Sequence, residues 1–168
     1  LHVIGGFPSV GKSAMCLQIG RNMAKGGKSV KYFSLEEDER NYMKRIISAE
    51  AHFPYSAYRN GLTPDQRKQQ GGLYAKVFRK GGTMYDCQFD IDDKNDTLES
   101  IWFACAKHKK KYGLDVVFVD GATNITHKES NDARRYNDIA QTLLKMAKKL
   151  DIVVFLVSHI NNEAQKPD

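Results

Sequence analysis

Cysteine is scarce in this sequence, and long apolar runs are missing from it altogether. The three cysteines, Cys16, Cys87 and Cys105, are an odd number without metal-ligand spacing, which argues against a disulfide framework or a zinc site. We therefore expect reduced, buried thiols in a cytosolic protein. No apolar stretch is long enough to cross a bilayer and no signal-peptide pattern opens the sequence, so we expect no membrane partner and a cytoplasmic location.

Internal repeats, low-complexity segments and a large excess of one charge are also missing. The 168 residues amount to one domain, and 41% hydrophobic with 27% charged residues is ordinary for a globular protein. A net charge of +6 attracts polyanions mildly and does not by itself indicate nucleic acid. Because the sequence opens on an apolar segment and stops soon after another, we expect residues 1–168 to be a fragment of a longer chain.

One short stretch carries the strongest chemical signal. Residues 6 to 13, Gly-Phe-Pro-Ser-Val-Gly-Lys-Ser, fit the phosphate-loop pattern Gly-x-x-x-x-Gly-Lys-Ser/Thr without a mismatch. The glycines let backbone N–H groups point at phosphate oxygens, and the following helix adds its positive dipole end. Lys12 is expected to contact the β- and γ-phosphates and Ser13 to ligate Mg²⁺. The predicted nucleotide-binding residues are Gly6, Pro8, Ser9, Val10, Gly11, Lys12, Ser13 and Ala14.

The segments around this loop have the strand, loop and helix order that a phosphate site requires. Residues 1–4 are a short apolar strand, and apolar residues at helical spacing from Met15 to Met23 predict a helix that Gly26 and Gly27 end. A glycine-rich turn without a ligand is the alternative, and it does not require this order. Further strands are predicted at residues 30–35, 87–91, 115–120 and 152–158, and the clearest helix at residues 136–150.

Three of these strands end in polar side chains. Glu36 follows residues 30–35, Asp120 ends residues 115–120, and His159 comes directly after residues 152–158. Because ligands of parallel α/β sheets gather at the carboxyl ends of the strands, we expect Glu36 to face the nucleotide, Asp120 to hold Mg²⁺ through water, and His159 to contact the γ-phosphate. The alternatives are a helix start for Glu36, a turn former for Asp120 and a structural histidine.

Other charged segments favour structural interpretations. Asp92 and Asp93 are more typical of a polar strand exit than of a metal site, and the basic residues 107–111 suit the last turn of a helix better than nucleic acid. Thr63 and Pro64 predict a helix towards Lys80 that two internal glycines kink or split. A capping box over residues 96–99 predicts the start of another helix.

With these residues assigned, the chain resembles the RecA-fold ATPase domain of DnaB-family replicative helicases over nearly its whole length. Gly-Lys-Ser is shared by many NTPases, whereas Phe-Ser-Leu-Glu at the end of the second predicted strand occurs in far fewer families. The resemblance implies an α/β fold of the RecA-like P-loop NTPase class, a mostly parallel central sheet with helices on both faces, truncated at its C-terminal side. The matching segments, in the same order, are residues 11–13, 33–36, 48–51, 91–93 and 134–158.

The resemblance also implies catalytic roles, with ATP and Mg²⁺ as cofactors. Glu36 would activate the attacking water, His159 would sense the γ-phosphate and Lys12 would complete the catalytic set, while Asp120 supports Mg²⁺. Bacterial members usually carry glutamine at the sensor position, so His159 points to a phage-type primase-helicase, whereas residues 48–51 look bacterial. Both origins stay open, in a bacterial cell or a phage-infected host. The family's arginine finger is expected downstream of residue 168.

The partners that the resemblance implies are single-stranded DNA, further copies of the chain in a homo-oligomeric, hexameric ring, and a primase. The loops at residues 121–131 and 160–168 would line the channel, with Lys128 and Lys166 as phosphate contacts. A RecA- or RadA-type recombination ATPase is the alternative that shares the fold and most of the site. A small-molecule phosphotransferase is a second alternative, against which Glu36 and the lack of an arginine-rich lid argue.

Overall fold

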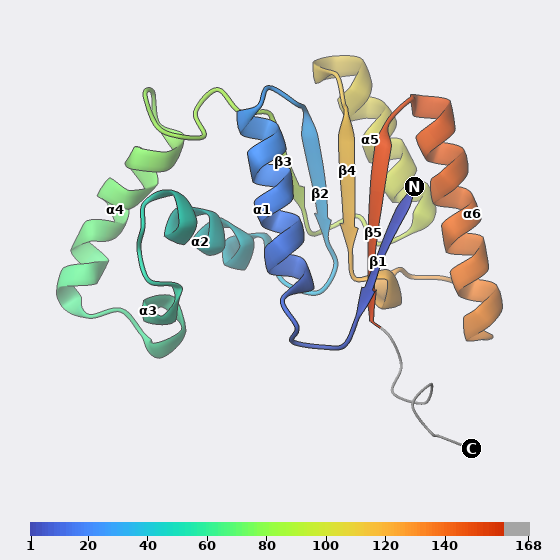
Figure 1. The fold of residues 1–168 in the computed structure, drawn as a ribbon, viewed down its shortest axis with the longest axis horizontal. Helices are drawn as coiled ribbons and strands as arrows, with labels where there is room; N and C mark the ends of the chain where they lie inside the picture. Colours follow the sequence, from blue (N-terminus) through green and yellow to red (C-terminus); the bar gives the residue numbers. More distant parts are fainter. Residues whose placement is uncertain (160–168) are drawn as a thin grey trace.

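The computed structural model describes residues 1–159, which build one parallel sheet covered by helices (Figure 1). The strand order is β1-β5-β4-β2-β3, and every neighbouring pair is parallel. The carboxyl ends of all the strands therefore lie at one edge of the sheet. The strands are β1 (His2–Gly6), β2 (Val30–Ser34), β3 (Phe89–Asp92), β4 (Val116–Asp120) and β5 (Val153–His159).

Helices lie on both faces of this sheet, which confirms the predicted architecture. The helix after β1 packs on one face with the helical segment between β2 and β3, and the helices before β4 and β5 pack on the other (Figure 1). The helices are α1 (Lys12–Lys25), α2 (Glu39–Glu50), α3 (Tyr55–Asn60), α4 (Pro64–Phe78), α5 (Leu98–Tyr112) and α6 (Asp132–Leu150), with a short 3-10 helix, η1 (Ala122–Asn124).

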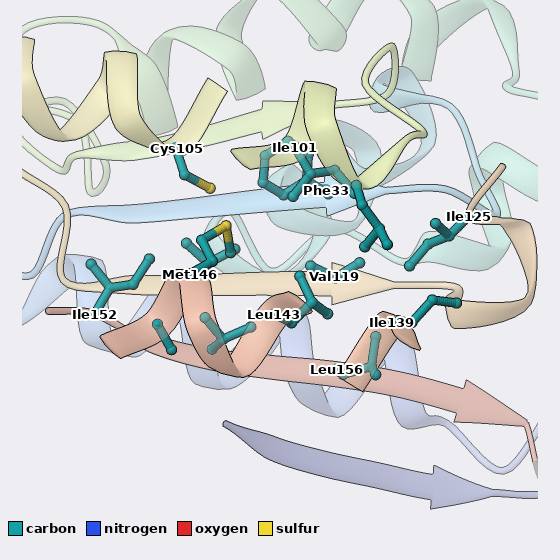
Figure 2. Close-up of a cluster of buried hydrophobic side chains, with 14 of the residues drawn as sticks. Phe33, Ile101, Cys105, Val119, Ile125, Ile139, Leu143, Met146, Ile152 and Leu156 are labelled. Atoms are coloured by element: carbon teal, nitrogen blue, oxygen red, sulfur yellow. The ribbon is translucent and has the colours of Figure 1, made fainter. Parts of the chain in front are cut away.

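Two apolar clusters join the layers because successive residues of a strand point to opposite faces. Tyr32 of β2 and Phe118 of β4 belong to the cluster under α1 and α2, whereas Phe33 and Val119 belong to the cluster under α5 and α6. Figure 2 shows this second cluster, where side chains of α5 and α6 meet those of β2, β4 and β5. All residues of β2 and β4 are buried, as expected of parallel strands covered on both faces.

The helix boundaries follow the predicted signals with two corrections. The box that opens α5 is formed by Thr97 and Ser100, whose side chains each accept a hydrogen bond from the other's backbone N–H at 3.1 Å. The prediction over residues 96–99 was wrong by one residue, because Asp96 instead accepts from the Thr126 hydroxyl at 2.9 Å. The second correction concerns α4, which begins at Pro64 as predicted and is not split at its two internal glycines.

The other charged segments have structural roles among the described residues. One oxygen of Asp92 accepts from the backbone N–H groups of Lys94 and Asn95, both at 3.1 Å, and residues 1–159 contain no cluster of acidic, histidine or cysteine side chains that could hold a metal ion. Lys109 donates to the Leu114 and Asp151 carbonyls, both at 3.1 Å, at the end of α5. Within the same residues, no helix is long and apolar enough to cross a membrane.

Candidate nucleotide site

The loop between β1 and α1 is shaped by two left-handed residues. Ser9 has φ of 63° and Gly11, the N-cap of α1, has φ of 91°. This curvature brings the loop over the start of α1, where unpaired N–H groups and the positive dipole end favour an anion. A side chain at Gly6 would come within 3.3 Å of the Lys12 Cδ atom, so glycine allows the lysine to pass close to the backbone.

The Lys12 ammonium is buried and has three acceptors. Its Nζ atom donates to the Gly6 carbonyl at 2.9 Å and the Phe7 carbonyl at 2.8 Å, and lies 3.1 Å from Nδ1 of His159. An ammonium has donors only, so Nδ1 must accept and the ring proton sits on Nε2. That Nε2 lies 2.9 Å from Oε1 of Glu36 and donates to it. Lys12, His159 and Glu36 thus form one hydrogen-bonded chain.

The sheet brings these residues together from distant parts of the sequence. Gly6 pairs with His159 across β1 and β5, Val157 pairs with Asp120 across β5 and β4, and Asp120 pairs with Ser34 across β4 and β2. Four neighbouring strands therefore end side by side, at the phosphate loop, His159, Asp120 and the segment that carries Glu36. The predicted catalytic residues and Asp120 lie along this one edge of the sheet.

The backbone before Glu36 is fixed by the loop that follows β4. The Leu35 N–H donates to the Asp120 carbonyl at 2.9 Å, and the Asn124 side chain donates to the Leu35 carbonyl at 2.7 Å. Gly121, with φ of +107°, leaves room for the glutamate, because a Cβ there would lie 2.8 Å from Glu36 Cγ. A glycine directly after Asp120 is thus required by both its backbone conformation and this close approach.

The acidic residues after β2 divide between the site and the next helix. Glu37 pairs with Arg45 at 2.7 Å, and Asp38 is the N-cap of α2, accepting from the Asn41 N–H at 2.8 Å. Glu36 contacts His159 instead. The helix-start interpretation therefore holds for Asp38, while Glu36 lies at the sheet edge and stays a predicted site residue.

Asp120 is fully buried at the end of β4. Its Oδ2 atom accepts from the hydroxyls of Tyr32 and Tyr42, both at 2.6 Å, and its Oδ1 atom has no hydrogen-bond partner among the described residues. Burial and the negative Asp120 raise the pKa of both tyrosines, so both hydroxyls stay protonated and donate. A buried carboxylate oxygen with unused lone pairs, together with the Ser13 hydroxyl in the first turn of α1, is a donor set that Mg²⁺ accepts.

The sequence analysis assigned no site role to Tyr32, which lies in the predicted strand at residues 30–35, or to Tyr42, whose ring suits the apolar face of a helix. The signal was present in their chemistry, since a buried tyrosine hydroxyl needs a hydrogen-bond partner. The partner depends on tertiary packing.

The cysteine thiols agree with the prediction at Cys16 and Cys105, which are buried and free, while Cys87 is half-buried. Burial, with a smaller effect of Asp120, raises the pKa of Cys16 to about 11 despite the opposing charge of Lys12.

Of the two predicted DNA contacts, the structure describes Lys128, which is not part of the hydrogen-bonded series from Lys12 to Glu36. Lys128 is exposed in the loop after η1, where it lines a cavity of about 750 Å³ together with Trp102 and Phe103 of α5. The preceding η1 is contacted by Arg135, which donates to the Thr123 carbonyl at 2.7 Å. Lys166 and the second predicted loop, residues 160–168, lie outside the described residues.

Comparison with known proteins identifies the relatives of this chain. The family model described as the DnaB-like helicase C terminal domain matches residues 1–168. The replicative DNA helicase DnaB of Rickettsia prowazekii is 26% identical over 179 residues, which cover 98% of this chain and 36% of the relative. That of Leifsonia xyli is 29% identical over 163 residues, covering 95% and 34%. The chain spans about a third of the length of these curated relatives.

Two solved structures share the fold. One is a DnaB-like replicative helicase described with its interactions with primase, with a TM-score of 0.80 and 23% identity, covering 100% of this chain and 41% of the other. The second is an ATPase domain with a TM-score of 0.80 and 22% identity, covering 99% and 59%. The RecA-like fold expected from the sequence is therefore confirmed. These comparisons lend no support to the recombination ATPase alternative.

Proposed function

Because this chain belongs to the family of DnaB-like helicase C-terminal domains, we propose that it is the ATP-hydrolysing motor domain of a ring-forming replicative DNA helicase. It binds ATP with Mg²⁺ and uses hydrolysis to move along single-stranded DNA. The observation that carries the proposal is the series of hydrogen bonds from Lys12 through His159 to Glu36. At the same sheet edge, the buried Asp120 has an Oδ1 atom without a hydrogen-bond partner among the described residues.

Lys12 is the group that binds the phosphates. Its ammonium donates to two neutral carbonyls of its own loop, and a charged phosphate oxygen is a stronger acceptor than either. A phosphate that drew the ammonium out of this position would also remove the donor of Nδ1 of His159, and the Nε2 hydrogen bond would pass the change to Glu36. His159 thereby links occupation of the phosphate loop to the position of the carboxylate.

Glu36 is the residue that acts on the attacking water. Its carboxylate lies at the same sheet edge as the loop. The backbone before it is fixed by the hydrogen bonds of Leu35, and Gly121 leaves room for its side chain. A carboxylate in that position orients the water and accepts its proton as the transition state forms. Ser13 and Asp120 would hold Mg²⁺, which when bound neutralises charge on the β- and γ-phosphates.

The proposed partners follow from the family. We infer that the full-length protein assembles into a hexameric ring, threads single-stranded DNA past Lys128 and Lys166, and works in the cytoplasm with a primase. The support for the primase is the DnaB-like helicase whose structure is described with its primase interactions. The exposure of Lys128 in the loop after η1 is the support for the DNA contact.

The test is unwinding of a forked DNA duplex by the full-length protein. ATP-dependent unwinding is expected in the parent, with phosphate released to water, and both are expected to disappear in Lys12→Ala together with nucleotide binding. Lys25→Ala is the matched control, because Lys25 ends the same helix and pairs with Glu50, which keeps its second partner Arg21 in this variant. Strand exchange without unwinding would favour the recombination ATPase, and phosphate transfer to a small acceptor would favour a phosphotransferase.

A further inference from the structure

Two tyrosine hydroxyls from different elements converge on a single oxygen of Asp120. Tyr32 comes from β2 and Tyr42 from α2, and each donates to Oδ2 at 2.6 Å. All three residues have no exposed surface. Oδ1 of the same carboxylate receives no hydrogen bond from any residue that the structure describes.

The tyrosine rings are held in place by their neighbours. The Tyr32 ring stacks on Phe118 with centroids 5.4 Å apart and an interplanar angle of 19°, and it packs against Tyr42 at 5.1 Å. The Phe118 ring stacks in turn on Phe155 at 4.8 Å. Rings fixed in this way hold their hydroxyls at defined points, so the oxygen that accepts from them is fixed too.

The distribution of the two donors is uneven. A carboxylate has about four lone-pair sites on its two oxygens, and buried polar atoms are normally satisfied. Donors that served only to keep the charge buried would be expected to satisfy both oxygens. Here both donors go to Oδ2, and Oδ1 is left without a donor among the described residues. Asp120 ends β4, which lies next to β5 and one strand away from β1, the strand that leads into the phosphate loop.

We propose that Tyr32 and Tyr42 are positioning residues that fix the Asp120 carboxylate by its Oδ2 atom and so present Oδ1 to a divalent cation or to its bound water. The proposal rests on the proposed function, because it assumes that Asp120 supports the cation. Hydrogen-bond partners of a ligand keep it oriented, and removing them typically lowers metal affinity about 10–100-fold.

The experiment measures Mn²⁺ binding by electron paramagnetic resonance in the full-length protein with a non-hydrolysable ATP analogue. Tyr32→Phe and Tyr42→Phe each remove one hydroxyl and keep the ring, and the double variant removes both. We expect the double variant to bind Mn²⁺ about 10–100-fold more weakly, with a smaller loss in each single variant. Binding of the analogue in the presence of EDTA should be unchanged, because Lys12 and its loop are untouched.

Tyr136→Phe is the matched control, because Tyr136 packs against the cluster on the opposite face of the sheet. A folded double variant that binds Mn²⁺ like this control would overturn the proposal, even if its melting temperature fell, because stability alone is what a purely structural pair would affect. If the double variant does not fold, the single variants decide: weaker Mn²⁺ binding than the control supports the proposal, and equal binding overturns it.

Asp120→Asn separates this proposal from the proposed function. If Asp120→Asn binds Mn²⁺ as tightly as the parent, the role of Asp120 in holding the cation is wrong, and the tyrosine proposal fails with it. If Asp120→Asn binds Mn²⁺ weakly while both tyrosine variants bind it normally, only the tyrosine proposal is wrong.

Discussion

Glu36 and Glu37 are adjacent in the sequence but differ in their partners. Glu36 accepts from His159 at 2.9 Å, whereas Glu37 pairs with Arg45 at 2.7 Å. Because general-base effects are typically about 10²–10⁴ in rate, we expect Glu36→Gln to lower ATP hydrolysis by that factor while nucleotide still binds. Glu37→Gln should change hydrolysis little, since it loses only a partly exposed ion pair. Nucleotide affinity and hydrolysis are measured separately in the full-length protein.

The opposite pattern would contradict this assignment. Hydrolysis that survives in Glu36→Gln and collapses in Glu37→Gln would show that the other acid is catalytic. Survival in both variants would remove the end of β2 from the catalytic site. Removing a carboxylate near a polyphosphate also relieves repulsion, so we expect nucleotide affinity in Glu36→Gln to equal or exceed that of the parent.

Gly121 offers a second test of the same carboxylate. With φ of +107° and only 2.8 Å between an added Cβ and Glu36 Cγ, Gly121→Ala should be strained and should displace the glutamate. A non-glycine residue in such a conformation costs about 1–3 kcal/mol. We expect lower stability in urea unfolding and a loss of hydrolysis.

Gly113→Ala is the control for this variant. Gly113 ends α5 with φ of +78° and has no atom near a Cβ, so alanine there carries a backbone cost without a collision. It lies before β4, at the opposite edge of the sheet. Stability should fall while hydrolysis by the folded protein is retained, and equal losses of hydrolysis in the two variants would disprove the specific effect on Glu36.

Among single residues, the ends of strands could be predicted and their contacts could not. Glu36, Asp120 and His159 follow apolar segments, and parallel pairing brings such positions to one edge whatever the details of packing. The roles of these residues stay predictions. The contact of Tyr42 with Asp120 depends on how α2 packs over β2, which no local sequence pattern specifies.

The presence of a helix or strand was easier to predict than the residues at which it begins and ends. The period of α6 predicted an apolar face of seven residues, and it missed Met146, which is buried. Of the seven, Ile139, Leu143 and Ala147 are buried, whereas Tyr136, Ala140, Leu144 and Leu150 are half-buried. The start of α5 was predicted one residue early, because the competition between Asp96 and Thr97 for the cap is decided by Thr126 in a distant loop. Tertiary contacts of this kind are invisible to a local pattern.

The glycines inside α4 give a prediction about stability. Gly71 and Gly72 are exposed, and a Cβ at either position meets open space. Because glycine in a helix interior is about 0.8–1.0 kcal/mol less favourable than alanine, Gly71→Ala and Gly72→Ala should each raise the free energy of unfolding by up to about 1 kcal/mol. Urea unfolding measures the change.

Gly82→Ala is the contrasting variant, since a Cβ there would lie 2.6 Å from the Val77 carbonyl oxygen. It should lower stability. No gain from either substitution in α4 would show that this helix does not persist as one piece in solution.

The loop after η1 carries the prediction about DNA. Lys128→Ala in the assembled full-length protein should weaken single-strand binding uniformly across sequences and flatten the slope of log affinity against log salt by about 0.7. Lys110→Ala is the control, because Lys110 is exposed at the end of α5, at the opposite edge of the sheet. An unchanged slope in Lys128→Ala would remove it from the DNA path. Lys166 carries the same prediction, though it lies outside the described residues.

At the scale of the whole molecule, the question is which catalytic groups residues 1–168 contain. The match to the family covers residues 1–168, and this stretch spans about a third of the length of its curated relatives. This chain supplies the phosphate loop, His159 and Glu36 of the described site. Under the proposed function, we expect an arginine from a neighbouring subunit to complete it.

We therefore expect residues 1–168 alone to bind ATP weakly and to hydrolyse it slowly. An arginine supplied by a neighbour contributes about 10³–10⁵ in rate in related sites, so a single subunit should fall short of the assembled ring by a factor of that order. Hydrolysis per subunit is compared between this segment, checked for folding by circular dichroism and for mass by light scattering, and the full-length ring. Equal turnover by a folded monomer would mean that the chain carries every catalytic group itself, and the role assigned to the neighbouring subunit would be wrong.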